Sequence, residues 1–137
     1  MTLVVVRHAR AGHASKWEGD DRVRPLDDKG RKQAASLPAL LRDVEIRRIV
    51  SSPYLRCVQT VEPLARERGL EIETAPGLGA DRQDRQAEPI LRELLAAGGA
   101  VVCVHGGIES ALDVDRGQKK GEAWLFDGAF GTPRPLG

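Results

Sequence analysis

The chain has 137 residues, of which 21 are Lys or Arg and 20 are Asp or Glu, so its formal net charge is +1. This balance excludes the broad field of one sign that would attract a nucleic acid polymer or an anionic membrane surface. The length fits one domain, no apolar run approaches the roughly 18 residues of a membrane span, and the N-terminus lacks a secretion signal pattern. The only cysteines, Cys57 and Cys103, are expected in a reduced cytoplasmic protein without a disulfide framework.

The first predicted element is a strand of Leu3 and three consecutive valines, a pattern typical of a parallel strand buried on both faces. It ends at Arg7 and His8, which places a cation and an imidazole at the carboxyl edge of the sheet. Open α/β folds bind their ligands at that edge. The polar segment 11–25 that follows is long for a connection within a domain, and such loops are often functional.

Four residues of this loop call for an interpretation. We interpret His13 as a solvated histidine, and the pair Asp20-Asp21 as exposed carboxylates that only contact solvent. Trp17 is more informative, because an aromatic side chain in a polar loop can stack on a base or cover a pocket. We therefore count Trp17 among the candidate substrate-binding residues.

The next elements are predicted as a helix, a strand and a second helix. Asp27 is a good N-cap for the first helix, in which Pro38 should cause a bend or an early end. A strand over 46–50 then leads to Ser52-Pro53, where Ser52 is predicted to cap a helix that begins at Pro53 and ends at Gly69. Arg56 would lie in its first turn, at a positive helix end where a cation is favourable only beside an anion.

The second half of the chain continues the alternation. A weak strand over 70–74 precedes a polar stretch that contains Asp81, and a third helix is predicted to begin at Glu88-Pro89. The apolar strand 100–104 ends at His105, and it is followed by a short helical turn and a charged loop in which Lys119-Lys120 form a solvated turn. The last predicted strand covers 122–126, and the Gly- and Pro-rich tail 127–137 is predicted to be irregular.

Alternating strands and helices predict an α/β fold, a single three-layer domain with a mainly parallel central sheet flanked by helices. Right-handed crossovers bring the carboxyl ends of such strands to a common edge. Arg7, His8, Arg56 and His105 each lie just past a strand or at the start of the following helix. We therefore expect these four side chains to converge.

Two arginines, two histidines and a helix N-terminus predict a site for a phosphate-like dianion. Neutral His8 could attack phosphorus with one ring nitrogen, and nearby Arg7 and Arg56 should keep the imidazole uncharged. The same cations would stabilise the charge on the transferring phosphoryl group. Attack of water on the phosphohistidine would make the protein a phosphatase, and attack of a second hydroxyl would make it a mutase or transferase.

Four motifs in this order resemble the histidine phosphatase superfamily, also called phosphoglycerate mutase-like, over roughly residues 3 to 126. They are Arg7-His8-Ala9, Arg24-Pro25-Leu26 with Gly30, Ser52-Pro53-Tyr54-Leu55-Arg56 continuing to Gln59-Thr60, and Val104-His105-Gly106. Within that superfamily the chain is similar to the small phosphohistidine phosphatases of SixA type. It is similar also to the phosphatase domain of actinobacterial MutT-like proteins, which share its Gly-Asp-Asp loop.

The resemblance implies a cytoplasmic hydrolase in which His8 is the phosphorylated nucleophile. Arg7 and Arg56 would then bind the phosphoryl oxygens, and His105 would be the second pocket histidine. Ser52 remains either a helix cap or a residue that also contacts the ligand. Ala9 replaces the usual glycine after the nucleophile, and the glutamate that donates a proton in many members is missing, which leaves Asp81 as the candidate acid.

Three functions remain open at this point. The favoured one is a metal-independent phosphatase, without a cofactor, that acts on a phosphohistidine protein or a small phosphate ester. The second is a nucleotide phosphatase in which Trp17 and the basic loop hold the base, and the third is a catalytically weak phosphate-binding module. Zinc is not expected, because His8 and His105 have no carboxylate ligand set beside them. The oligomeric state cannot be inferred from these patterns.

Overall fold

A computed structural model describes residues 1–136, in which six strands form one central sheet in the order β3-β2-β4-β1-β5-β6. Strands β3, β2, β4 and β1 are parallel, whereas β5 is antiparallel to β1 and β6 is antiparallel to β5. The predicted mainly parallel α/β sheet is therefore confirmed. The strands are β1 (Thr2–Arg7), β2 (Arg48–Ser51), β3 (Ile72–Thr74), β4 (Ala100–Val104), β5 (Ala123–Asp127) and β6 (Arg134–Leu136).

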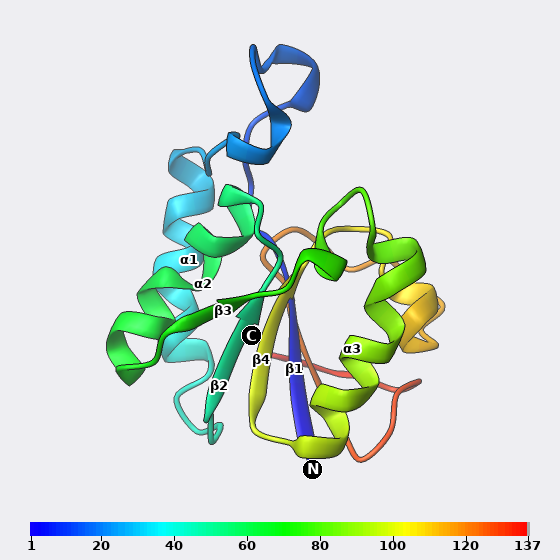
Figure 1. Cartoon of the computed structure of the whole chain (residues 1–137). Coiled ribbons are helices and arrows are strands. Elements are labelled where there is room, and N and C mark those ends of the chain that lie inside the picture. Colours follow the sequence, from blue (N-terminus) through cyan, green and yellow to red (C-terminus); the bar gives the residue numbers. More distant parts are fainter. Residues whose placement is uncertain (137) are drawn as a thin grey trace.

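Helices α1 (Asp28–Leu40) and α2 (Leu55–Arg68) cover one face of the sheet, and α3 (Gln83–Ala97) covers the other (Figure 1). Within residues 1–136 no helix is long and apolar enough to cross a bilayer. Four short 3₁₀ helices lie in the connections: η1 (Ala14–Lys16), η2 (Asp21–Val23), η3 (Pro76–Leu78) and η4 (Glu109–Leu112).

The valine run of β1 contributes to both halves of the core, as its composition predicts. Leu3 and Val5 pack on the side of α3, and Val4 and Val6 pack on the side of α1 and α2. All four side chains are at most 1% exposed, and burying a side chain of this size stabilises a fold by about 1.5–3 kcal/mol. This burial fixes β1 at the centre of the sheet, with Arg7 at its end.

Helix α2 begins later than the sequence predicts. Tyr54 is its N-cap, and the first helical residue is Leu55 rather than Pro53. The prediction of Ser52 as the helix cap is therefore wrong. The backbone at Ser52 still continues the pairing of β2 with β4, because its N–H donates to the Cys103 carbonyl at 3.1 Å. The Ser52 hydroxyl instead accepts from the Tyr54 N–H at 3.2 Å, one turn before the helix.

Two further boundaries differ from the predictions. Helix α3 begins at Gln83 and contains Pro89 in its interior, whereas a proline there was expected to mark the start. A proline removes a single intrahelical hydrogen bond, which the packing of this amphipathic helix offsets. The tail is not irregular throughout, because Arg134–Leu136 pairs with β5 as an edge strand, a position that tolerates Pro135. The final residue of the predicted tail, 137, lies outside the described part of the chain.

Gly30, in the first turn of α1, allows that helix to approach the loop that follows β1. A Cβ atom on Gly30 would fall on the carbonyl oxygen of Arg10. We expect Gly30→Ala to lower the free energy of unfolding by about 2 kcal/mol, as overpacked sites do, although alanine is the better helix former. Gly117→Ala is the matched control, since a Cβ there has no neighbour within 4 Å. Equal urea midpoints for the two variants would contradict the close approach.

Candidate active site

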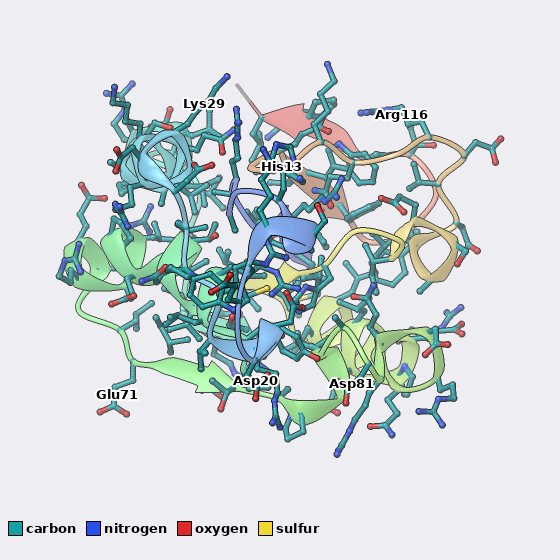
Figure 2. The ribbon with its side chains drawn as sticks, turned by 90° about the horizontal axis from the view of Figure 1, so that it is seen from above. His13, Asp20, Lys29, Glu71, Asp81 and Arg116 are labelled. Atoms are coloured by element: carbon teal, nitrogen blue, oxygen red, sulfur yellow. The ribbon has the colours of Figure 1, made fainter. Side chains whose placement is uncertain are left out.

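The structure brings Arg7, His8, Arg56 and His105 to the carboxyl edge of the sheet. Arg7 ends β1, His105 follows β4, and Arg56 is the second residue of α2, which follows β2. The ring centroids of His8 and His105 are 5.4 Å apart, with the rings edge to face. Seen from above, the loop that carries His13 and Asp20 lies over this edge (Figure 2).

His8 is held as a neutral imidazole with one free ring nitrogen. Its Nδ1 lies 2.8 Å from the Ala9 carbonyl, and since a carbonyl can only accept, Nδ1 carries the proton and Nε2 keeps its lone pair. Burial lowers the pKa of His8 from 6.5 to about 3, and the charges of His105, Arg56 and Arg7 act in the same direction against the opposing hydrogen bond to Ala9. The lone pair is therefore available at neutral pH.

The turn after His8 is tied to α2 by Thr60. The Ala9 N–H donates to Thr60 Oγ1 at 2.9 Å, and that hydroxyl donates to the Arg56 carbonyl at 2.7 Å. The Ala9 methyl group is fully buried in a small cluster with Ala11, Leu26 and Ala34. The structure thus accommodates alanine where glycine is usual, and Thr60 was noted in the sequence only as part of a motif.

Arg7 is oriented by the far end of the chain. Its Nη1 donates to the Gln118 carbonyl at 2.7 Å, and its guanidinium lies against Gly106, where a Cβ would be 2.7 Å from the Arg7 Cζ. The Arg7 Nε is buried and has no hydrogen-bond partner among the described residues. Gln118 could not be identified from the sequence, because Arg7 contacts its backbone carbonyl, a group that every residue has.

Arg56 is 4% exposed and is held by Asp21. Its Nη1 donates to the Asp21 carbonyl at 2.9 Å and its Nη2 donates to the Asp21 carboxylate at 3.1 Å, while its Nε is buried without a partner among residues 1–136. The interpretation of Asp21 as a merely solvated carboxylate is therefore wrong. The i, i+3 spacing between Asp21 and Arg24, which also form an ion pair at 2.9 Å, was a signal that could have identified it.

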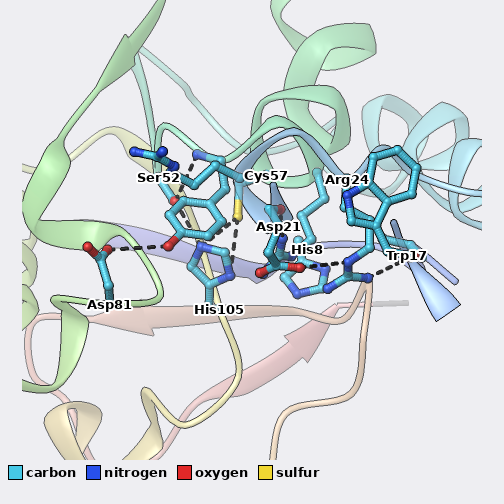
Figure 3. A network of polar contacts seen from close by, with 12 residues as sticks. His8, Trp17, Asp21, Arg24, Ser52, Cys57, Asp81 and His105 are labelled. Carbon is cyan, nitrogen blue, oxygen red and sulfur yellow. Dashed lines mark hydrogen bonds and ion pairs between the residues drawn. The ribbon is translucent and has the colours of Figure 1, made fainter. Parts of the chain in front are cut away.

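His105 contacts polar groups of the β2–α2 connection. Its Nε2 lies 2.8 Å from Ser52 Oγ and 3.6 Å from Cys57 Sγ, and its ring packs edge-on against Tyr54 at 4.7 Å between centroids. Ser52 thus reaches the second imidazole. The Asp81 carboxylate accepts from the Tyr54 hydroxyl at 3.4 Å, so Tyr54 stands between Asp81 and His105 (Figure 3).

The remaining predicted residues lie outside the cluster. Trp17 is 37% exposed, and its indole N–H donates to the Asp20 carbonyl at 3.0 Å in the loop that projects from the body (Figure 1). His13, Lys119 and Lys120 are exposed. Within the described chain, no group of three or more His, Cys, Asp or Glu side chains is arranged to hold a metal ion.

Comparisons with known proteins agree with this geometry. The sequence model of the histidine phosphatase superfamily (branch 1) matches residues 3–80. The chain belongs to this superfamily. It is 33% identical over 140 residues to an 8-oxo-(d)GTP phosphatase of Mycolicibacterium smegmatis (strain ATCC 700084 / mc(2)155), an alignment that covers 91% of this chain. That alignment covers 44% of the relative, so this chain spans less than half of its length.

Solved structures confirm the fold. The protein histidine phosphatase SixA complexed with tungstate superposes with a TM-score of 0.73 at 23% identity, over 98% of this chain and 94% of that one. A mycobacterial glucosyl-3-phosphoglycerate phosphatase complexed with VO3 gives a TM-score of 0.69 at 18% identity, over 90% and 91% of the two chains. The α/β architecture of this histidine phosphatase is therefore that of its superfamily.

The depressed pKa of His8 predicts a pH dependence of stability. Unfolded His8 binds a proton below 6.5, whereas folded His8 stays neutral down to about 3, so the folded state loses stability as the pH falls between these values. Relative to His8→Gln, we expect the wild type to lose about 1.4 kcal/mol of unfolding free energy per pH unit between about pH 6 and about pH 4. Urea unfolding measures this difference, and a constant difference would contradict a neutral buried His8.

Proposed function

We propose that this histidine phosphatase hydrolyses a phosphorylated substrate through a phosphohistidine on His8, without a metal ion or cofactor. The observation that carries the proposal is a pair of buried guanidinium nitrogens, the Nε atoms of Arg7 and Arg56, which have no partner within residues 1–136 and accompany an imidazole with a free Nε2. Buried donors without partners are costly unless a ligand accepts from them. A phosphoryl group offers such acceptors in the forked geometry that arginine matches.

The reaction follows from these groups in two displacements. His8 Nε2 forms a bond to phosphorus while the bond from phosphorus to the leaving group breaks, and the leaving group departs with the bonding electron pair. Water then attacks the phosphohistidine, losing a proton, and inorganic phosphate and neutral His8 are regenerated. Arg7 and Arg56 stabilise the equatorial oxygens in both steps, and His105, whose Nε2 lies 2.8 Å from Ser52 Oγ, supplies a further donor.

For the substrate we propose a phosphohistidine protein or a small phosphate ester. The relative named as a protein histidine phosphatase shares the fold over nearly the whole chain. The sequence has Gly77-Leu78-Gly79-Ala80-Asp81 where many members of the superfamily carry a proton-donating glutamate, and phosphohistidine needs less protonation of its leaving group than an alkyl phosphate does. The cytoplasmic location stays a prediction.

A nucleotide substrate is the second candidate, and one observation favours it. The 33% identical relative is named an 8-oxo-(d)GTP phosphatase. Trp17, partly exposed on the loop near the site, could stack on a purine base in such a substrate. A phosphate-binding module without turnover is the weaker third candidate, because simple binding has no use for an Nε2 lone pair kept free by the Nδ1–H bond to the Ala9 carbonyl.

A substrate panel in excess EDTA tests the proposed function. We expect hydrolysis of an aryl phosphate and of a phosphohistidine peptide, and comparison with nucleoside di- and triphosphates and phosphoglycerates ranks the candidates. His8→Ala should reduce turnover to background, and mass spectrometry of rapidly quenched wild type should find phosphate on His8. Normal activity in His8→Ala would rule out the covalent mechanism, and loss of activity in EDTA would rule out metal independence.

Asp81 remains our proposed proton donor, acting at the rim beside Tyr54. If it protonates the leaving group, Asp81→Asn should slow an alkyl phosphate by about tenfold or more, yet barely affect an aryl phosphate with a good leaving group. The alkaline limb of the pH–rate profile should change with the alkyl substrate alone. Equal rates for both substrates in the variant and the wild type would remove this assignment. Asp84→Asn, an exposed carboxylate of the α3 N-terminus, is the control.

A further inference from the structure

The loop between β1 and α1 is attached to the body of the protein through Asp21. Every residue of 13–23 is exposed, so no side chain of this segment is buried in the core. The Asp21 residue nevertheless accepts three hydrogen bonds from guanidinium groups: Arg24 Nε and Arg56 Nη2 on its carboxylate, at 2.9 and 3.1 Å, and Arg56 Nη1 on its carbonyl, at 2.9 Å. A single exposed residue thus contacts two buried guanidinium groups.

These contacts occupy one edge of the Arg56 guanidinium and leave another edge free. A guanidinium has five N–H groups in a rigid plane. Asp21 accepts one hydrogen bond from each Nη, whereas the Nε is buried without a partner among the described residues. The side edge formed by Nε and Nη2 is thus available for a forked contact with a phosphoryl group.

Arg24 extends the same chain of contacts to the nucleophile loop. Its Nη1 donates to the Ala11 carbonyl at 2.6 Å, while its Nε holds the Asp21 carboxylate (Figure 3). Although desolvation alone would raise it, the hydrogen bond from Arg24 and the charge of Arg56 hold the pKa of Asp21 below its ordinary value, so the carboxylate is ionised. The segment after His8 and the first turn of α2 are therefore joined through one carboxylate.

The neighbouring carboxylate shows that this arrangement is particular to Asp21. Asp20 pairs with Arg22 at 2.7 Å, and the Arg22 side chain is 70% exposed. Asp20 also caps η2 by accepting from the Arg22 N–H at 2.9 Å. It therefore serves its own turn only, and asparagine would cap that turn equally well.

We propose that Asp21 is a positioning residue for catalysis, which holds Arg56 by its two Nη groups so that the Nε–Nη2 edge faces the phosphoryl group. This role rests on the proposed function, because it concerns the same phosphoryl site. The alternative role is that of a competitor, in which the Asp21 carboxylate would itself occupy the position of the substrate phosphate. Occupation of that place would require the carboxylate to take the edge that the structure leaves free.

Loss of positioning should affect the transition state more than the ground state. A misaligned guanidinium can still attract a dianion, but it no longer matches the equatorial oxygens as phosphorus becomes five-coordinate. For Asp21→Ala we expect kcat on an aryl phosphate to fall about tenfold or more, with KM within about threefold of wild type. Asp20→Asn, the matched control, should retain the wild-type values, and thermal unfolding should show both variants folded.

A double-mutant cycle tests whether Asp21 acts through Arg56. Arg56→Lys removes the fork, so adding Asp21→Ala in that background should lower kcat less than about twofold. A further tenfold loss there would show that Asp21 acts independently of Arg56 and would overturn the proposal. Tighter inhibition of Asp21→Ala by inorganic phosphate, with unchanged or higher kcat, would also overturn it, since this is the behaviour of a removed competitor.

Orthovanadate binding, measured by calorimetry, separates this proposal from the proposed function. Vanadate adopts the five-coordinate geometry of the transition state, so Asp21→Ala should weaken its binding about tenfold or more in the wild type and less than about twofold in Arg56→Lys. If the wild type shows no His8-dependent hydrolysis but this pattern holds, the proposed function fails and the positioning role stands. If hydrolysis depends on His8 but Asp21→Ala binds vanadate as the wild type does, only the positioning role fails.

Discussion

The structure around the site depends on positively charged side chains that are buried with few acidic or hydrogen-bonding partners. Arg56 is almost fully buried, Arg7 has a buried Nε, and buried His8 directly follows β1, where its N–H donates to the Val104 carbonyl at the end of β4. Burying a charge costs several kcal/mol unless it is paired and hydrogen-bonded. The partners on the protein side are the Gln118 carbonyl for Arg7 and Asp21 for Arg56, so the site stays short of negative charge and of hydrogen-bond acceptors. A phosphoryl dianion supplies both.

The convergence of the site could be predicted because it follows from the backbone alone. Arg7 ends one of the strands that the valine-rich runs identify and His105 directly follows the other, and in a parallel sheet those strand ends must share an edge. Arg56 follows from the same rule, since α2 leaves the end of β2. The fold class needed only the alternation of apolar strands and amphipathic helices, which is a local property of the sequence.

The contacts that orient these side chains could not be predicted, because they join segments distant in sequence through ordinary groups. Gln118 holds Arg7 with a backbone carbonyl across 111 positions, and no residue type encodes a carbonyl. The i, i+3 spacing of Asp21 and Arg24 could have indicated their ion pair, but nothing in the sequence joins Asp21 to Arg56, which lies 35 positions further along the chain. The start of α3 and the edge strand β6 were missed for a related reason, since the packing of α3 overrode the signal of Pro89 and the pairing of β6 with β5 overrode that of Pro135.

In the proposed mechanism, affinity for the substrate and reactivity of His8 have the same physical origin. The positive potential that would attract a dianion also opposes protonation of His8, whose pKa burial has already lowered to about 3. A carboxylate next to His8 would weaken both effects, because it would repel phosphate and stabilise the imidazolium. Asp21 places its negative charge at the outer edge of Arg56, so it compensates the buried guanidinium while leaving the inner edge positive. The position of this one carboxylate therefore keeps the site both ordered and reactive.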